Sequence, residues 1–153
     1  MKLHELNQRS DNKEIKLNEI YAQFTKLLIE LEKRELPDEI VVSINKNIDE
    51  INSISNIGNE LRKQIKHRLQ RIIKLLEKDL KLTPRNYYRN MWMSLGMAAF
   101  GIPIGVAFGT SLGNMAYLGI GLPIGLAIGI GVGDGMDKNA FAEGRQLDIE
   151  VNG

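Results

Sequence analysis

A run of 43 residues without a charged side chain, from Met91 to Gly133, constrains this chain more than any other feature. About 20 apolar residues form one helix that crosses the hydrocarbon core of a bilayer, so the run has the length of two such helices. Asn114 lies near its middle, in the sequence LGNMAYLG, at the most polar and turn-prone point available. The sequence therefore predicts two antiparallel membrane helices, from about Trp92 to Leu112 and from about Met115 to Val132.

The same run contains one glycine-rich phrase twice, as GIPIGVAFGTSLG at 101–113 and as GLPIGLAIGIGVG at 121–133. A linker would be polar and a strand pair would repeat every second residue, whereas these glycines recur every fourth residue and so share one helix face. Such a face lets two helix backbones approach closely inside a membrane, where the helical state is nearly obligatory. The arms could fit each other or copies of each other. The predicted packing residues are Gly101, Gly105, Gly109, Gly113, Gly121, Gly125, Gly129 and Gly133.

Proline and interfacial residues add detail to the two predicted spans. Pro103 and Pro123 occupy matching positions in the two phrases, and each is expected to kink its helix. Before the first span lies a cluster of aromatic and basic side chains of the kind found at membrane surfaces. Because no basic residue lies in the turn, the positive-inside rule places both termini in the cytoplasm. The predicted interface residues are Arg85, Tyr87, Tyr88, Arg89 and Trp92.

The first 83 residues contain three stripes of apolar residues at helical spacing. Asp11 and Glu14 resemble a capping box for the first helix, at about 12–35, and Pro37 is placed to begin the second. A break near Gly58 precedes the third helix, and Thr83 with Pro84 resembles the N-cap and first residue of the first membrane helix. The stripes are Ile15, Ile20, Phe24, Leu27, Leu28 and Leu31; Ile40, Ile44, Ile48, Ile51 and Ile54; and Leu61, Ile65, Leu69, Ile72, Ile73, Leu76 and Leu80.

Narrow apolar stripes with charges between them are typical of a coiled coil or a small helical bundle. The three helices could fold against each other within one chain or pair with copies, and we favour a bundle that includes contacts between copies. The N-terminal sequence MKLHELNQRSDNKE is polar and lacks the apolar core of a secretory signal, so we expect no export by the usual route.

The formal charge of +1 conceals a strongly basic band, because residues 61–90 carry 10 basic and 2 acidic side chains. Three interpretations are open. The band could touch anionic lipid at the cytoplasmic face, form the solvated side of the third helix with salt bridges to the acidic first helices, or bind nucleic acid. Nucleic acid is the least favoured, because the band adjoins a membrane span and lacks an aromatic stacking pattern.

Residues suited to chemistry are scarce. The chain has no cysteine, and its two histidines, His4 and His67, are isolated from one another. The sequence DGMD at 134–137 suggests calcium, but it lacks the further oxygen ligands of an EF-hand loop. The glycine phrases lack the lysine and the strand–turn–helix setting of a phosphate-binding loop. We therefore predict no enzyme activity, no metal and no cofactor.

The tandem phrases, followed by GMDKNAFAEGRQL, resemble the bacterial glycine-zipper family of small membrane proteins over residues 92–148. The resemblance implies a helical hairpin that oligomerises through the eight glycines, in the bacterial inner (cytoplasmic) membrane. Some members of this family form pores, while others are lipoproteins or assembly factors. The absence of a lipobox cysteine excludes the lipoprotein branch.

The predicted fold class is all-α, with a cytoplasmic helical bundle or coiled coil at 1–83, a two-helix transmembrane glycine-zipper hairpin at 84–135 and a short polar tail at 136–153. Two functions are open: a homo-oligomeric, membrane-anchored assembly or scaffold subunit, and an oligomeric pore gated by the cytoplasmic helices. The only polar side chains deep in the spans are Ser94, Thr110 and Ser111, which favours assembly over conduction. The expected partners are the lipid bilayer, further copies and a protein bound to the cytoplasmic helices.

Overall fold

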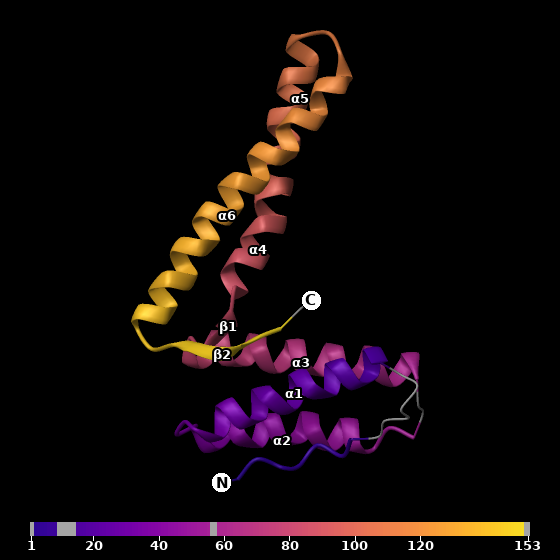
Figure 1. The fold of residues 1–153 in the computed structure, drawn as a ribbon, viewed down its shortest axis with the longest axis vertical. Helices are drawn as coiled ribbons and strands as arrows, with labels where there is room; N and C mark the ends of the chain where they lie inside the picture. Colours follow the sequence, from indigo (N-terminus) through magenta and orange to yellow (C-terminus); the bar gives the residue numbers. More distant parts are fainter. Residues whose placement is uncertain (1, 9–14, 56–57, 152–153) are drawn as a thin grey trace. The chain divides into compact units, whose positions relative to one another are not determined.

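A computed structural model describes residues 2–8, 15–55 and 58–151 of the chain (Figure 1). The predicted all-helical fold is confirmed, with three polar helices followed by two long apolar helical arms. The proposed capping box of Asp11 and Glu14 lies outside the described residues. The elements are α1 (Ile15–Glu32), α2 (Asp38–Asn52), α3 (Asn59–Leu80), β1 (Thr83–Arg85), α4 (Tyr87–Gly96), the π-helix η1 (Met97–Gly101), α5 (Ile102–Ser111), the 3-10 helix η2 (Met115–Tyr117), α6 (Leu118–Ala142) and β2 (Gln146–Glu150).

The chain divides into two compact units. The first, which we call the bundle, comprises the described residues up to Pro84 together with those from Leu147 onward. The second, which we call the hairpin, comprises residues 85–146. The first unit therefore contains chain from both sides of the second, a division that the linear domain boundaries at 83 and 135 do not describe.

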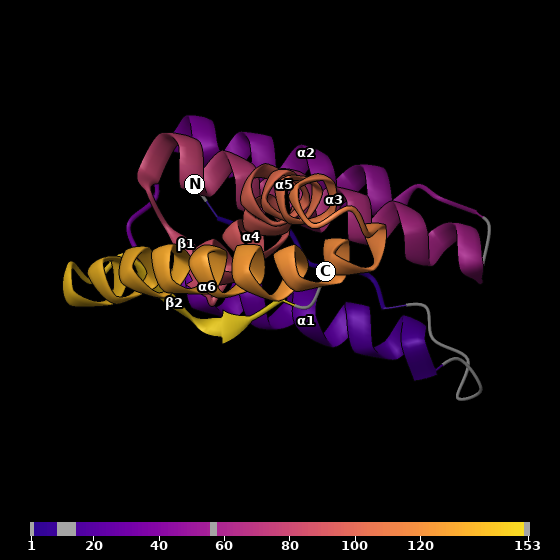
Figure 2. The same ribbon diagram turned by 90° about the horizontal axis from the view of Figure 1, so that it is seen from above.

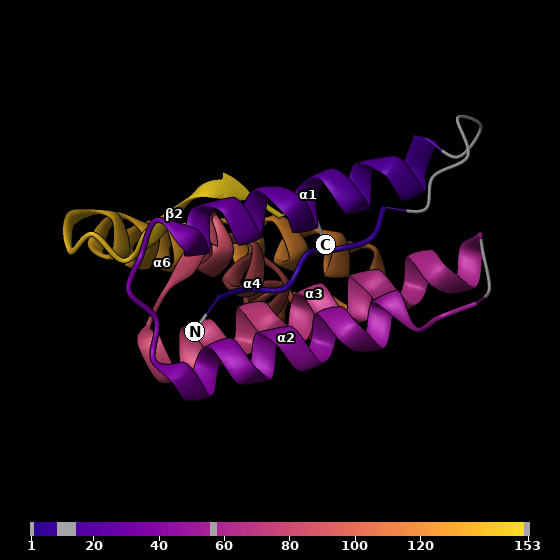
Figure 3. The same ribbon diagram turned by 90° about the horizontal axis from the view of Figure 1, so that it is seen from below.

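The bundle forms because α3 packs against both α1 and α2, as the views from above and below show (Figures 2 and 3). Phe24, Ile44 and Leu69, one from each helix, are at most 1% exposed. The apolar stripes therefore bury one another within one chain, and contacts between copies are not needed to cover them. Ile15 is an exception, because it is 71% exposed at the start of α1. Ile54 is another, because α2 ends at Asn52.

Local chemistry explains where two of these helices begin and end. Gly58 precedes α3 with φ 98° and ψ −145°, a backbone conformation that side chains other than glycine rarely adopt, so the predicted break is confirmed. Helix α3 ends at Leu80, and the next residue, Lys81, is left-handed with φ 57°. The N–H of Leu82 donates to the carbonyl of Leu76 at 3.1 Å, closing a Schellman-type cap without a glycine.

The prediction that Thr83 and Pro84 begin the first membrane helix is wrong. Both residues are buried in strand β1, and α4 begins only at Tyr87, after Asn86 in a left-handed conformation with φ 59°. The reason is tertiary, since β1 pairs with β2, more than 60 residues further along the chain (Figures 1 and 2). Local patterns carry no information about so distant a partner strand.

The C-terminal residues complete the bundle. Helix α6 continues to Ala142, and residues 146–150 form β2, so the stretch predicted as a short polar tail is mostly regular structure. Leu147 is fully buried and Ile149 is 5% exposed. The N–H of Asp148 also donates to a carboxylate oxygen of Glu30 on α1, at 3.4 Å. The last strand thus belongs to the core and not to a solvent-exposed extension.

Candidate membrane hairpin and its glycine interface

The hairpin consists of two arms that are long and apolar enough to cross a membrane, Tyr87–Ser111 with 25 residues and Met115–Ala142 with 28. At about 1.5 Å per residue each exceeds the roughly 30 Å hydrocarbon core of a bilayer. Only 17% of the most apolar window of each arm is buried. The arms therefore lack the extensive burial of a core helix in a water-soluble protein.

The predicted glycine face lies between the two arms of the same chain. A Cβ atom added to Gly105 would lie 2.5 Å from the carbonyl oxygen of Leu118, and one added to Gly101 would lie 3.1 Å from that of Gly121. Nearer the bundle end, a Cβ on Gly129 would lie 3.1 Å from the Cα of Met93. The backbones are in contact along the interface, so a side chain at these positions would force the arms apart. Within the described chain, the glycine repeat lies between the two arms of one hairpin.

Gly96 belongs to this interface although the four-residue repeat does not include it. It is buried, and its added Cβ would lie 2.8 Å from the Cα of Gly129. Gly96 precedes Gly101 by five residues, and the intervening Met97–Gly101 segment is a π-helix with a wider turn. The extra residue in that turn returns Gly96 to the glycine face. In the sequence, the signal for Gly96 as an interface residue is a GxxxxG step directly before the GxxxG series.

The two prolines have different surroundings. Pro103 is the second residue after the π-helix, at whose end the N–H of Ile102 donates to the carbonyl of Met97, five residues back. This wider turn accommodates a residue that has no N–H to donate. Pro123 instead lies inside the α-helix α6. The two prolines therefore occupy matching positions in the sequence repeat but differ in their local backbone geometry.

The turn between the arms lies where the sequence predicts it. Gly113 is left-handed with φ 65°, and the Asn114 side chain accepts a hydrogen bond from the N–H of Ala116 at 2.9 Å. A Cβ added to Gly113 would meet nothing within 4 Å, so this residue serves the turn and not the interface. Gly109 faces Met115, whose sulfur would lie 2.9 Å from an added Cβ.

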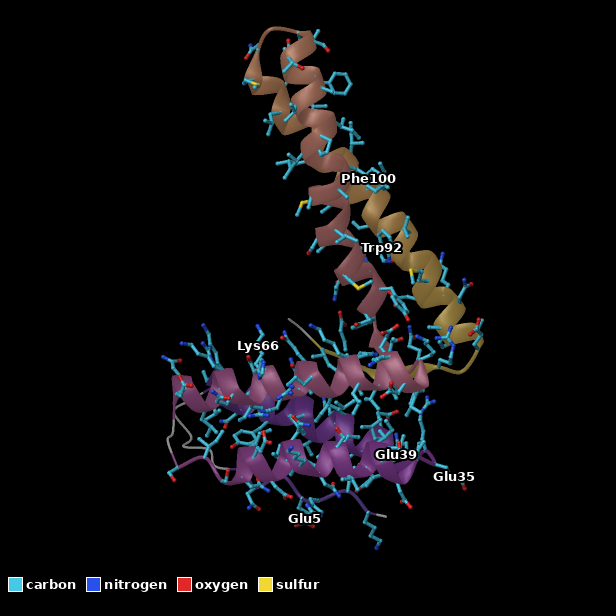
Figure 4. The ribbon with its side chains drawn as sticks, turned by 180° about the vertical axis from the view of Figure 1, so that it is seen from behind. Glu5, Glu35, Glu39, Lys66, Trp92 and Phe100 are labelled. Carbon is cyan, nitrogen blue, oxygen red and sulfur yellow. The ribbon has the colours of Figure 1, made fainter. Side chains whose placement is uncertain are left out.

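The outer surface of the hairpin is made of large apolar side chains. Phe100 is 43% exposed and projects from the first arm (Figure 4). Thr110 does not interrupt this surface with an unsatisfied hydroxyl, because it donates to the carbonyl of Val106 at 2.9 Å in its own helix. The further exposed apolar residues include Leu95, Ile102, Val106, Phe108, Leu112, Ile120, Leu122, Ile124, Ile128 and Val132.

Asp137 closes the open end of the hairpin, a role that sequence reasoning missed. Its carboxylate accepts hydrogen bonds from the N–H groups of Tyr88 at 3.1 Å and Arg89 at 2.9 Å, and the residue is only 7% exposed. These N–H groups lie in the first turn of α4, where they lack intrahelical partners and the helix dipole favours a negative charge. Asp134 adds an exposed ion pair with Arg89 at 3.5 Å. The DGMD sequence thus joins the arms.

The predicted interface residues lie at this end of the hairpin. Tyr87 and Tyr88 form an edge-to-face pair with ring centroids 5.2 Å apart, and Tyr88 is buried. Trp92 is half-buried on the first arm (Figure 4), while Arg85 and Arg89 are exposed. The aromatic and basic residues therefore mark the end at which the chain joins the two strands.

Most of the basic band lies on α3, where five of its side chains are exposed on one face. Among the described residues, the half-buried Arg68 is the only basic side chain of α3 that forms an ion pair with another helix, with Glu50 on α2. Lys66 projects outward from α3 (Figure 4). The salt-bridge interpretation therefore explains a small part of the band. The exposed basic residues of α3 are Lys63, Lys66, Arg71, Lys74 and Lys78.

Within the described ranges there is no group of three or more His, Asp or Glu side chains arranged to hold a metal ion. His4 lies beside Asp49, with its Nδ1 at 2.9 Å from a carboxylate oxygen, and His67 is exposed on α3. No family model, no curated protein and no solved structure matches the chain. The resemblance to the glycine-zipper family therefore stays a prediction.

Proposed function

We propose that this chain is a membrane-anchored assembly subunit, in which the hairpin crosses a bilayer and holds the bundle at one membrane surface. The observation that carries the proposal is the inverted burial of the hairpin. The glycines of its interface face inward against backbone, while Phe100, Phe108 and Leu112 are 43–57% exposed. Such an arrangement is costly in water and favourable in lipid, where the arms need only backbone contact to associate.

The pairing of β1 with β2 supports the placement of both ends of the hairpin on the same side of the membrane. The first arm follows β1 and the second arm precedes β2, and the two strands are neighbours in one sheet. If the arms span the bilayer, this pairing requires that both ends emerge on the side of the bundle. The basic residues of the chain favour the cytoplasmic side of a bacterial inner membrane.

The exposed basic face of α3 suits contact with anionic lipid headgroups. Only six residues separate Leu80, the end of α3, from Tyr87, the start of the first arm. At about 3.3 Å per extended residue this linker keeps the C-terminal end of α3 within roughly 20 Å of the membrane surface. Each lysine or arginine near such a surface contributes about 1 kcal/mol.

Homo-oligomerisation and pore formation have less support. The glycine face is used within the hairpin, so a contact between copies would have to use the outward apolar side chains. Thr110 satisfies its hydroxyl in its own helix, which leaves little polar lining for a conducting path. An oligomer stays a prediction, and we favour anchoring over conduction.

Cysteine labelling tests the proposal directly, because the chain has no cysteine of its own. Three single variants of the full chain, Asn114→Cys in the turn, Ser53→Cys after α2 and Glu143→Cys after α6, are produced in bacteria and treated with a membrane-impermeant maleimide. We expect labelling of Asn114→Cys in intact cells, and labelling of the other two only after lysis. Recovery of the protein in the soluble fraction, or equal labelling of all three variants, would refute the anchored hairpin.

A liposome assay separates anchoring from conduction. Purified protein is reconstituted at increasing protein-to-lipid ratios, and release of a trapped dye and of potassium is measured. We expect vesicles that stay tight at every ratio. Leakage that grows with protein content and disappears in Gly125→Leu would establish the pore in place of the anchor.

A further inference from the structure

The N-terminal residues 2–8, which we call the strap, lie along α2 in the bundle (Figure 3). The strap has no helix or strand assignment and is mostly exposed, with only Leu3 and Leu6 half-buried. The sequence analysis treated this segment only as a polar N-terminus.

Two asparagines of α2 hold the strap by its backbone. The Asn45 side chain accepts from the N–H of His4 at 2.8 Å and donates to the carbonyl of Lys2 at 2.9 Å. Asn45 is 5% exposed, so this amide is largely removed from water.

Asn52 makes the same pair of hydrogen bonds with the next three residues of the strap. It accepts from the N–H of Asn7 and donates to the carbonyl of Glu5, both at 2.9 Å. Each amide thus pairs with the carbonyl of one residue and the N–H of the residue two positions later. That is the pattern by which an extended backbone is read independently of its side chains.

The spacing of the two asparagines matches the repeat of an extended chain. Asn45 and Asn52 are seven residues apart, which is about 10.5 Å along a helix axis. The backbone triplets that they hold, Lys2–His4 and Glu5–Asn7, are offset by three residues. Three residues of polyproline-II or extended chain cover roughly 9–10 Å. Helix α2 is therefore in register with an extended peptide over two successive triplets.

The half-buried apolar side chains of the strap follow the same three-residue repeat. Leu3 and Leu6 are the half-buried residues of the strap, one in each triplet. Leu3 lines a solvent-open cavity of about 520 Å³ together with Leu31, Leu36 and Val41, and with the charged residues Lys2, Glu32, Arg34 and Glu35. This volume greatly exceeds a leucine side chain, so the cavity has room for a larger side chain than Leu3, with an apolar part against the leucines and a polar end toward the charged residues and water. Selectivity among extended peptides would come from the side chains at the positions of Leu3 and Leu6.

We propose that this face of α2, the asparagine groove, is a binding site for an extended segment of a partner protein with apolar side chains three residues apart. The strap occupies the groove as an intramolecular competitor. Its backbone hydrogen bonds can be reproduced by any extended chain, and the open cavity beside Leu3 favours a partner with a larger side chain at that position. This inference concerns the bundle alone and does not depend on the membrane function.

The test uses the full chain in mild detergent and a fluorescent peptide with the sequence of residues 1–8 as the probe. The strap is first weakened by His4→Pro together with Asn7→Pro. This double variant lacks the two backbone N–H groups that donate hydrogen bonds to Asn45 and Asn52. We expect the peptide to bind this variant saturably, and at least about tenfold more weakly to the intact chain, because the tethered strap competes at high effective concentration.

Recognition by the asparagines is tested in the background of this double variant. Asn52→Asp removes the donor but keeps the shape, and we expect binding at least about tenfold weaker. Gln70→Glu on the exposed face of α3 makes the same chemical change away from the groove and should leave binding unchanged. A probe peptide with prolines in place of its own fourth and seventh residues should not bind.

The outcomes are distinct. No peptide binding by the proline variant, while circular dichroism shows that it melts as the intact chain does, would refute the site. If the proline variant does not fold, deletion of residues 2–8 replaces it, and loss of folding there as well would make the strap structural and refute the proposal. An intact chain that dimerises, and becomes monomeric when His4 and Asn7 are changed to proline, would assign the groove to the strap of a second copy and overturn the partner assignment.

Discussion

The bundle and the hairpin are both helical, but they bury opposite kinds of residue. In the bundle, large side chains such as Phe24 and Leu27 are fully buried while charged residues face outward. In the hairpin, Gly121, Gly125 and Gly129 are buried while large apolar side chains face outward. The bundle has the burial expected of a unit that folds in water, and the hairpin has the burial expected of helices that associate in lipid, because water drives apolar side chains together and lipid does not.

The largest effect is expected in the bundle. Phe24→Ala removes a fully buried ring and should destabilise the bundle by about 3–5 kcal/mol, because the transfer energy is lost and a cavity remains. Phe100→Ala on the outer face of the hairpin is the matched change and should cost less than about 1 kcal/mol in detergent. Thermal melting followed by far-ultraviolet circular dichroism measures both. Equal losses would mean that Phe100 is buried in the functional state.

The second effect tests the inner face of the hairpin. A Cβ at Gly125 would lie 2.5 Å from the carbonyl oxygen of Gly96, whereas one at Gly131 on the same helix would meet nothing within 4 Å. Gly125→Leu should destabilise the hairpin by about 3 kcal/mol or more, because backbone cannot move aside, while Gly131→Leu should have little effect. Trp92, the single tryptophan, reports on the hairpin by its fluorescence. If the glycines instead joined copies, Gly125→Leu would lower the mass of the complex and leave the hairpin intact.

A smaller effect is expected where the arms are joined. Asp137→Ala leaves the N–H groups of Tyr88 and Arg89 without their acceptor and should cost about 1–2 kcal/mol. Asp134→Ala breaks only an exposed ion pair and should cost less than about 1 kcal/mol. Urea unfolding of both variants in mild detergent, read from Trp92 fluorescence, gives the two values. A larger loss for Asp134 would show that the ion pair, and not the cap, joins the arms.

The smallest effect concerns pH and the strand that returns to the bundle. The hydrogen bond from Lys33, aided by that from the N–H of Asp148, lowers the pKa of Glu30 from its ordinary value of 4.5. A lowered carboxyl pKa contributes stability above the ordinary value and loses it as the pH falls through the folded value. Glu30→Gln should therefore destabilise the bundle by less than about 1 kcal/mol at pH 7 and by nothing in acid, where the carboxyl is protonated in both states.

Glu32→Gln, an exposed neighbour on α1, is the control for this pH dependence. Its unfolding curves should follow those of the unchanged chain at both pH values. If Glu30→Gln lowered the stability of the bundle equally at both pH values, the charge of Glu30 would not contribute to that stability.

Some expectations from sequence were correct because their signals are local. The period of the apolar stripes, the glycine break at Gly58 and the turn at Asn114 each depend on residues within one or two helical turns. Others were missed because their cause lies far along the chain. Thr83 and Pro84 have the local pattern of a helix start, yet they form a strand with residues more than 60 positions away.

By itself, the sequence determined that this chain has three amphipathic helices and two apolar helical arms, because periodicity and charge are properties of neighbouring residues. Only the tertiary structure decided that the glycine face closes within one hairpin, that Asp137 caps the helix opposite it and that Asn45 and Asn52 hold the strap. Each of these depends on which backbones approach one another. A repeat of small residues permits a close approach, but the identity of the approaching partner is set by the packing of the whole chain.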